Sequence, residues 1–349
     1  MRITVAIACY NLEDRISLCL ESVISQDYED LEILIVDDCS TDRSVEIVEN
    51  LIRQHPEREI RIIVNQTNQG LCKVRNTSIN EARGEAIFFM DGDDTIEPGT
   101  LSLFVCRMKE TGVDVVCGSF RKTDLAGNTI LTKQFPEDTF KGNFAYSQYI
   151  EKHITGFFWL PLWNNLYRLD FLRSNDIYCA THYRKYELCL FTFKVILNAT
   201  GVSYINKVTY NWCDIPSSIT NAIKKNIDLL RNFRVVIESL IDAKNDFLSR
   251  HDIKQLPPGA SFLINYVILT QGYLKSAMQS AVISKAEKRQ FLKWLKKTYR
   301  DNSMNLSNIV GPFNRLSYLI LISPFPYLLF RFYFKHLKTV SKIVNRLVK

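Results

Sequence analysis

The sequence predicts an α/β protein with a doubly wound, mostly parallel sheet and a C-terminal helical extension, and two patterns support this fold class. In the first 118 residues, short runs rich in Ile and Val alternate with stretches whose apolar residues recur at helical spacing. Such alternation is typical of right-handed βαβ units. From about residue 226 to residue 299 the pattern is helical with few breakers. The 349 residues suffice for one large domain or two ordinary ones.

The strands predicted in the first hundred residues are almost continuously apolar, as parallel strands covered by helices on both faces are. They span residues 4–8, 32–36, 60–64 and 86–90. The helices predicted between them span residues 16–24, 45–52 and, more weakly, 71–82. A further strand is expected at residues 113–118, followed by a hairpin around residues 124–128.

Polar residues follow each of the first four predicted strands at the point where it ends. In chain order they are Tyr10-Asn11, Asp37-Asp38, residues 65–70 and residues 91–94. Doubly wound sheets bind their ligands at the carboxyl ends of their strands. We therefore expect these polar clusters to form one site.

Three carboxylates within four residues, those of Asp91, Asp93 and Asp94, close the fourth predicted strand. They repel one another, so we expect a cation to neutralise them in the folded protein. Oxygen ligands suit Mn²⁺ or Mg²⁺, and substrate phosphates and water would complete a shell for which this loop alone supplies too few ligands. The alternative is an acidic turn that caps a helix beginning near Pro98. A calcium-binding EF-hand loop is excluded, because its terminal Glu is missing at the required spacing.

Four blocks of the sequence resemble the family 2 glycosyltransferases of GT-A fold, across roughly residues 3–215. No single block is specific, but the ordered set is. The blocks are VAIACYN at 5–11 with CLESVISQ at 19–26, EILIVDDCSTD at 32–42, NQGLCKVRN at 68–76 with GEAIFFMDGDD at 84–94, and a weaker WNNLY at 163–167. Three departures from the family pattern remove no ligand: Ala8 replaces a common Pro, Cys39 a common Gly and Gly92 a common Ser.

The resemblance implies a nucleotide-sugar site at the carboxyl ends of the strands. Its nucleotide-binding residues would be Ala8, Tyr10, Asp38, Arg75, Asn76, Asp91 and Asp94, and its metal ligands Asp93 and Asp91. Tyr10 would line the base pocket and Asp38 would hydrogen-bond the nucleobase. Asp94 would lie at the ribose or the ion. The Mn²⁺ or Mg²⁺ ion would bridge the diphosphate of the donor.

Several of these roles have a structural alternative. Asp38 could instead cap the helix that follows it. Tyr10 could be a half-buried ring of the core, and Arg75 could pair with Glu81 or Glu85 on the surface.

The general base is the point at which the resemblance is weakest. Members of the family invert the anomeric configuration and usually take the base from a Glu-Asp or similar pair well after the metal motif. In the matching stretch, residues 186–193, Glu187 is present but Leu188 occupies the usual Asp position. Either Glu187 is the catalytic base, or a nearby group such as His182 is, or the enzyme is impaired. Glu187 could also be a helix N-terminal residue favoured by the helix dipole.

The net charge of +7 comes from the end of the chain, because seven basic residues and no acidic ones follow Asp301. The rest of the chain is electrically balanced, which argues against nucleic acid as a partner. Residues 316–330 are uncharged but contain Pro324 and Pro326, and they fall short of the roughly 20 residues that a spanning helix needs.

A cationic, amphipathic helix is predicted beyond residue 330. Its basic residues recur at steps of three or four, opposite an apolar stripe, and are Arg331, Lys335, Lys338, Lys342, Arg346 and Lys349. This pattern suits an anionic membrane surface. The alternative is a helix packed on the protein or on a second subunit.

These observations predict a GT-A domain at residues 1–218, a helical extension at 219–310 and a basic, membrane-associating tail at 311–349. Nine cysteines without a CxxC pair indicate reduced thiols, so we expect a cytoplasmic protein, peripheral at the inner face of the membrane.

The predicted function is inverting, metal-dependent transfer of a hexosyl or N-acetylhexosaminyl group from a nucleotide sugar, expected to be a UDP-sugar. The acceptor would be a glycan or lipid-linked hydroxyl in surface polysaccharide synthesis. A catalytically impaired nucleotide-sugar-binding or scaffold protein of the same fold is the alternative. A nucleotidyltransferase is not supported, because no Gly-rich phosphate loop with Lys or Arg follows the first strand.

Overall fold

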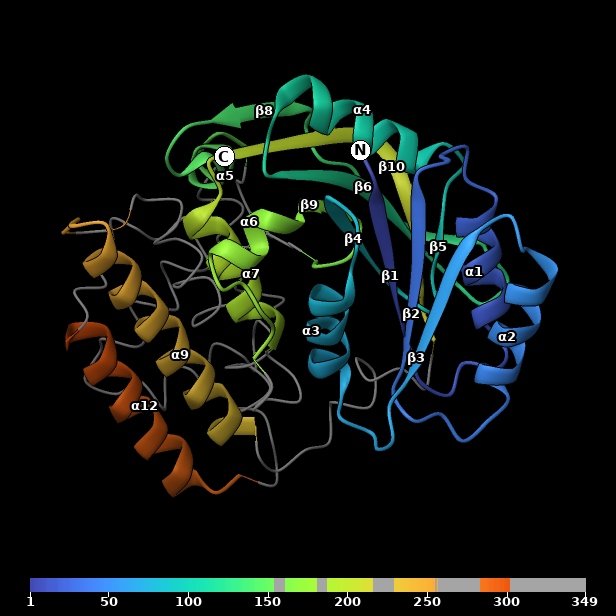
Figure 1. Ribbon diagram of the computed structural model, residues 1–349. Coiled ribbons are helices and arrows are strands. Elements are labelled where there is room, and N and C mark those ends of the chain that lie inside the picture. The colour runs from blue at the N-terminus through green and yellow to red at the C-terminus, as the bar shows by residue number, and fades with distance from the viewer. Residues whose placement is uncertain (154–160, 181–186, 216–228, 255, 257–282, 302–349) are drawn as a thin grey trace. The chain divides into compact units, whose positions relative to one another are not determined.

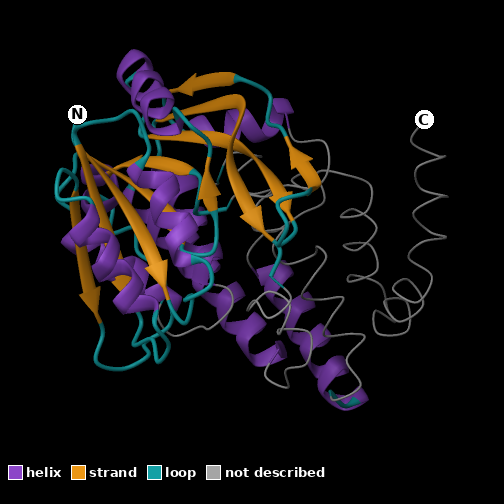
Figure 2. Cartoon of the chain, turned by 90° about the vertical axis from the view of Figure 1, so that its right-hand side faces the viewer, coloured by secondary structure: helices purple, strands orange, loops and turns teal. Residues whose placement is uncertain are grey.

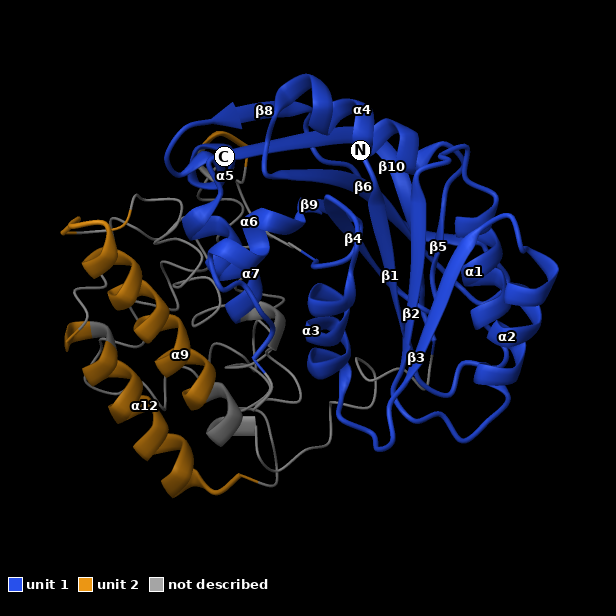
Figure 3. Ribbon diagram, viewed as in Figure 1, with its two compact units in different colours: residues 1–149, 159–221 blue, residues 150–158, 222–349 orange. Residues whose placement is uncertain are grey.

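The computed structural model describes residues 1–153, 161–180, 187–215, 229–254, 256 and 283–301. The chain forms two compact units (Figure 3). The first contains residues 1–149 and 159–221, and the second contains residues 150–158 and 222–349.

The first unit is built on a ten-stranded sheet in the order β3-β2-β1-β4-β9-β6-β10-β5, with β7 paired to β6 and β8 to β10. Its strands are β1 (Ile3–Cys9), β2 (Leu31–Asp37), β3 (Glu59–Val64), β4 (Ala86–Asp91), β5 (Thr95–Ile96), β6 (Val115–Thr123), β7 (Thr129–Lys133), β8 (Asp138–Lys141), β9 (Asn165–Arg168) and β10 (Gly201–Cys213).

Most of the strands in this sheet point the same way. β1 pairs in parallel with β2 and β4, β2 with β3, and β6 with β10. β9 runs antiparallel to both β4 and β6, so β4 and β6 are parallel to each other. The carboxyl ends of the parallel strands therefore meet at one side of the sheet, which we call the carboxyl edge. The predicted fold class is confirmed.

Helices cover both faces of the parallel strands. They are α1 (Ile16–Ile24), α2 (Ser44–Gln54), α3 (Leu71–Glu81), α4 (Thr100–Thr111), α6 (Leu169–Ser174) and α7 (Glu187–Asn198), with α5 (Ala145–His153) beginning in this unit. Figure 1 shows α1 and α2 on one side of β1, β2 and β3 and α3 on the other. Figure 2 shows the strands and helices of the chain in a view turned by 90°. All seven residues of β2 are buried, because it is shielded on both faces.

Most observed element boundaries lie within one or two residues of the predicted ones, and two differences are described here. The strand expected at 113–118 runs instead from Val115 to Thr123, because it continues to pair with β10 and gains β7 on its other side. The turn between β6 and β7 is the expected hairpin. The helix expected near Pro98 begins at Thr100, after Gly99, whose φ is 74°.

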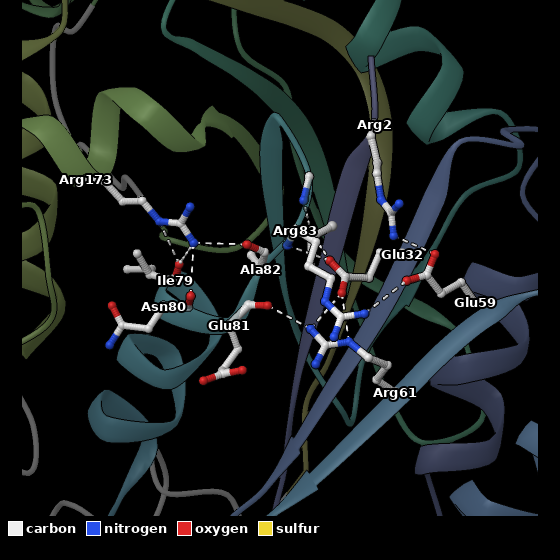
Figure 4. A network of polar contacts seen from close by, with 12 residues as sticks. Arg2, Glu32, Glu59, Arg61, Ile79, Asn80, Glu81, Ala82, Arg83 and Arg173 are labelled. Carbon is white, nitrogen blue, oxygen red and sulfur yellow. Dashed lines mark hydrogen bonds and ion pairs between the residues drawn. The ribbon is translucent and has the colours of Figure 1, made fainter.

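A polar network ties the elements together at the opposite side of the sheet, the amino edge (Figure 4). The buried Glu32 carboxylate accepts hydrogen bonds from Thr4 Oγ1 at 2.6 Å, from the Arg83 main-chain N–H at 2.8 Å and from the Arg61 guanidinium at 2.7 and 2.9 Å. Arg173 donates to three main-chain carbonyls at the end of α3. The turn from α3 into β4 is thus held at the edge away from the predicted site.

The second unit contains two described helices, α9 (Leu229–Arg250) and α12 (Lys285–Asp301). The Arg234 guanidinium lies 4.9 Å from the centre of the Trp294 ring, so these helices contact each other. They confirm the predicted helical pattern where that region is described. The predicted tail at 311–349 lies outside the described residues. None of the helices in the described ranges is long and apolar enough to cross a membrane.

Candidate active site

The strand register brings the predicted polar clusters together at the carboxyl edge. Ala8 of β1 lies opposite Asp91 of β4, and Cys9, the next residue of β1, lies opposite Asp37 of β2. The residues that follow these strand ends, including Tyr10, therefore start from neighbouring positions. Tyr10 is 46% exposed, so the alternative that its ring belongs to the core is wrong.

Asp94 is directed into the protein. Its buried carboxylate accepts hydrogen bonds from the Tyr210 hydroxyl at 2.6 Å and from the main-chain N–H of Cys213 at 2.8 Å. Burial, followed by the nearby charges of Asp93 and Asp91, raises its pKa well above the usual range. Asp94 thus ties the acidic loop to β10, whereas the family resemblance implied a position at the ribose or the ion.

Asp91 forms an ion pair with Arg75 of α3. The distance from Arg75 Nη2 to Asp91 Oδ1 is 2.6 Å, and the side chains are 3% and 28% exposed. Burial alone would lower the pKa of Arg75, but the charge and hydrogen bond of Asp91, together with Cys179 and Cys72, outweigh burial and raise that pKa. The alternative that Arg75 pairs with Glu81 or Glu85 on the surface is wrong. Among the described residues, the buried Nη1 of Arg75 has no hydrogen-bond partner.

Asp93 is the carboxylate of this loop that remains for a ligand. Within the described ranges, no other residue donates a hydrogen bond to its side chain. Burial, and next the charge of Asp91, raise its pKa to about 6. The Arg15 guanidinium also lies at this loop, and its Nη2 donates to the main-chain oxygen of Asp93 at 3.4 Å. Arg15 was missed by the sequence analysis, because nothing in its local sequence marks it.

Gly92 occupies a position where a side chain would clash with neighbouring atoms. Its N–H donates to the Ala8 carbonyl at 3.0 Å, and a Cβ would lie 2.7 Å from that oxygen and 2.9 Å from Leu12 Cδ1. The Ser that is common in the family at this position would therefore require the β1 backbone to move. Cys39, where the family commonly has Gly, has a φ of 66°, which is the left-handed conformation that glycine adopts most easily.

Asp38 organises the loop that leads into α3. It is 3% exposed, and its carboxylate accepts hydrogen bonds from Asn65 Nδ2 at 2.9 Å, Gln69 N at 2.8 Å and Gly70 N at 2.7 Å. The alternative that Asp38 caps α2 is wrong, because Asp42 accepts from the N–H and hydroxyl of Ser44 there. The predicted hydrogen bond from Asp38 to a nucleobase stays a prediction.

Asn76, next to Arg75 on α3, binds a segment far along the chain. Its Nδ2 donates to the Cys179 carbonyl and its Oδ1 accepts from the Cys179 N–H, both at 2.8 Å. This places the Asn76 amide on the segment that leads towards α7. That helix begins at Glu187, but the side chain of Glu187 and all of His182 lie outside the described residues.

A divalent ion would find few protein ligands here. In the part of the chain that the structure describes, no three His, Cys, Asp or Glu side chains converge as a metal site. Asp94 and one oxygen of Asp91 are bound to the protein, which leaves Asp93 and the second Asp91 oxygen. One or two carboxylates fit an ion such as Mg²⁺, which keeps water and takes phosphate oxygens from the substrate.

Comparison with known proteins matches the part of the chain that contains the predicted nucleotide-binding and metal-ligating residues. Residues 4–163 match the family model described as glycosyl transferase family 2. The chain is 30% identical over 229 residues to the uncharacterized glycosyltransferase EpsJ of Bacillus subtilis, covering 62% of each protein. It is 27% identical over 230 residues to a cholesterol galactosyltransferase of Borreliella burgdorferi, covering 64% of this chain and 63% of the relative. The chain thus spans a little under two thirds of these relatives' lengths.

Solved structures share the fold. The crystal structure of S. aureus TarS 1-349 in complex with UDP superimposes with a TM-score of 0.67 at 21% identity, covering 97% of this chain and 92% of that one. The complex of the same protein with UDP-GlcNAc gives 0.66 at 22% identity, covering 92% and 90%. At this identity the likeness establishes the fold.

Proposed function

Because residues 4–163 match the family model described as glycosyl transferase family 2, we propose that the chain is a member of this family, an inverting glycosyltransferase that uses a nucleotide sugar. The donor is a UDP-sugar, and the acceptor is a hydroxyl of a glycan or lipid-linked molecule in surface polysaccharide synthesis. One observation carries the proposal. Asp93 lies at the carboxyl edge, beside the ends of β1 and β4, and no other residue in the described ranges donates a hydrogen bond to its carboxylate.

The choice of donor rests on the fold and on the position of the site. The TarS structures of the same fold were solved with UDP and UDP-GlcNAc, and doubly wound sheets bind nucleotides at the carboxyl ends of their strands. The exposed Tyr10 ring lies at that edge. We infer that it stacks on the base, next to the loop that Asp38 holds.

We propose that Mn²⁺ or Mg²⁺ binds to Asp93 and Asp91. When bound, such an ion acts as a Lewis acid on the departing diphosphate, typically worth several kcal/mol. The protein contributes the shape of the loop. Gly92 allows it to lie against β1, Tyr210 holds it through Asp94, and Arg75 orients Asp91.

In the proposed reaction the acceptor oxygen bonds to the anomeric carbon while the bond from that carbon to the phosphate oxygen breaks. The hydroxyl proton passes to a base, and the nucleoside diphosphate leaves with the electron pair. We propose Glu187 as that base, at the first residue of α7. A positioned base contributes about 10²–10⁴-fold in rate.

A second candidate function is that of a nucleotide-sugar-binding or scaffold protein without transferase activity. The observation that favours it is Leu188, which occupies the place of the usual Asp. A leucine accepts no proton, so in that case the site binds the donor without turnover.

The location of the protein is a further proposal. The predicted basic tail, with six Lys or Arg residues at helical spacing from Arg331 on, would hold the protein to an anionic cytoplasmic membrane face. Each basic residue near such a surface contributes on the order of 1 kcal/mol. Removal of residues 331–349 should shift the protein from the membrane to the soluble fraction of a cell extract, and an unchanged distribution would contradict the proposal.

Heat protection tests the site. A ligand at 100 times its Kd stabilises a protein by about 2.7 kcal/mol, so a UDP-sugar with Mn²⁺ should raise the Tm. Asp93→Asn should remove this protection. The matched control is Asp176→Asn, which changes an exposed carboxylate, paired only loosely to Lys194 at 3.4 Å. Asp176 has a φ of 51°, which asparagine tolerates well. If Asp93→Asn retains full protection, the proposed site is wrong.

Turnover separates the two candidate functions. Release of UDP from the protecting UDP-sugar, measured with and without candidate acceptors, should occur if the chain is a transferase. Glu187→Gln should then lower kcat by about 10²-fold or more while the donor still protects. Protection without any release of UDP would favour the binding protein.

A further inference from the structure

Arg75 forms an ion pair with Asp91, a carboxylate that we propose as a ligand of the metal ion. We propose that Arg75 is a positioning residue that withholds Asp91 from the divalent ion until a nucleoside diphosphate binds, so that metal and nucleotide bind cooperatively. This inference rests on the proposed function, because it concerns the same site. It adds that metal binding depends on the nucleotide, and that Arg75 determines when Asp91 is available to the ion.

The ion pair is built into the frame of the first unit. Arg75 lies on α3 and Asp91 at the end of β4, and Nη2 and Oδ1 are 2.6 Å apart. The Arg75 side chain is 3% exposed, so an ion that took Asp91 away would leave a buried, uncompensated guanidinium. Breaking a buried pair in this way is strongly unfavourable.

The free site therefore offers the ion Asp93 and one oxygen of Asp91, whose charge Arg75 already neutralises. Asp94 is hydrogen-bonded to Tyr210 and Cys213 through both of its oxygens. Mg²⁺ and similar ions bound by one or two carboxylates depend on phosphate oxygens and water for the rest of their shell. We expect Mn²⁺ to bind weakly in the absence of nucleotide.

A diphosphate changes the balance for Arg75. Its Nη1 is buried and has no hydrogen-bond partner among the described residues, which is an unfavourable state for a donor. Phosphate oxygens are preferred partners of a guanidinium, because they accept two parallel hydrogen bonds. When the Arg75 guanidinium hydrogen-bonds the phosphate instead of Asp91, the Asp91 carboxylate becomes available to the ion. Metal and diphosphate then strengthen each other's binding by the same factor, as thermodynamic linkage requires.

The test is the affinity of the purified full chain for Mn²⁺, measured from the free-ion EPR signal with and without UDP. In the wild type, UDP should raise the Mn²⁺ affinity about tenfold or more, and Mn²⁺ should raise the UDP affinity equally. Arg75→Met should raise the nucleotide-free Mn²⁺ affinity about tenfold, since Asp91 is released, and should reduce the coupling to UDP. Arg61→Met is the matched control, because it breaks an arginine–carboxylate pair of 2.7 Å at the amino edge and should leave both values unchanged.

Two further variants keep the proposal testable if Arg75→Met does not fold. Asp93→Asn should abolish nucleotide-free Mn²⁺ binding, whereas Asp91→Asn should weaken it much less, because Arg75 already withholds one oxygen of Asp91 and neutralises its charge. Equal losses in these two variants overturn the proposal, and so does an Arg75→Met protein whose nucleotide-free affinity is unchanged or lower. If UDP binds to no variant, the proposed function fails, but the nucleotide-free comparison still decides the role of Arg75.

Discussion

Glu32 offers a direct test of how the amino edge stabilises the fold. Its Oε2 accepts from Thr4 and from the Arg83 N–H, and its Oε1 accepts twice from Arg61 (Figure 4). A carboxylate accepts at both oxygens, whereas an amide has one acceptor and one donor. In Glu32→Gln a donor therefore faces other donors, whichever way the amide is turned.

The size of the effect follows from burial. Glu32 is fully buried, and removal of one partner of a buried ion pair costs about 3–5 kcal/mol. Arg61, however, is 23% exposed, so water can solvate part of the charge that is left behind. We expect Glu32→Gln to lower the free energy of unfolding by about 2–4 kcal/mol at pH 7.

Urea unfolding over a range of pH measures this loss and its origin. Burial alone would raise the pKa of Glu32, but hydrogen bonds from Thr4, the Arg83 N–H and Arg61, with the charge of Arg61, lower it below the ordinary 4.5. A group with a depressed folded pKa stabilises the protein above its unfolded pKa and stops doing so as the pH falls through its folded pKa. The gap between wild type and Glu32→Gln should therefore be complete above pH 4.5 and narrow below it.

The matched control is Glu59→Gln. Glu59 also pairs with arginine, but its side chain is 42% exposed, so its loss should cost at most about 1 kcal/mol. The reasoning would be refuted if Glu32→Gln lowered the free energy of unfolding by less than about 1 kcal/mol at pH 7. It would also be refuted if the difference from wild type stayed constant down to pH 3.

Three other substitutions test the carboxyl edge. Gly92→Ser should destabilise the protein by about 1–3 kcal/mol, because its Cβ would meet the Ala8 carbonyl at 2.7 Å. An unchanged midpoint of urea unfolding would contradict this and show that the β1 backbone shifts at little cost. Asn76→Ala should lower kcat while the UDP Kd stays the same, since the amide binds Cys179; a loss of UDP affinity would instead place Asn76 at the nucleotide. Tyr10→Ala should leave stability within about 0.5 kcal/mol but weaken UDP about tenfold or more if the ring stacks on the base, and equal UDP affinity would exclude stacking.

The sequence predicted the frame of this site because the frame depends on local pattern. Apolar strands and helical stripes defined the βαβ units, and the ends of parallel strands must share an edge. That Ala8 and Asp91 both lie at the carboxyl edge follows from those two facts, whereas their direct opposition depends on the strand order and register, which were not predicted. The sequence did not predict that the Tyr10 ring is exposed, because a ring directly after a strand can turn either to the core or to solvent.

The partners of the acidic loop depend on contacts that no local pattern contains. Tyr210 is 116 residues from Asp94, and only the folded sheet brings β10 to that loop. Arg75 did leave a trace in the sequence, because it shares the buried stripe of α3 with Ser78. A charged residue on a buried stripe requires a partner inside the protein, and this excludes Glu81, which the surface alternative required.

The two edges of the sheet differ in how completely their polar groups are satisfied. At the amino edge, every hydrogen-bonding oxygen of Glu32 is used by the protein itself, which suits an edge with a purely structural role. At the carboxyl edge, the described protein leaves one buried N–H group of Arg75 and one of Arg15 without an acceptor, and no other described residue donates to the Asp93 carboxylate. Native proteins rarely leave buried polar groups unpaired, and such groups require an explanation. A bound phosphate would supply acceptors for the two unpaired N–H groups, and a metal ion would neutralise the Asp93 carboxylate. The energetic cost of these unpaired groups is therefore the physical reason to expect the ligand at this edge.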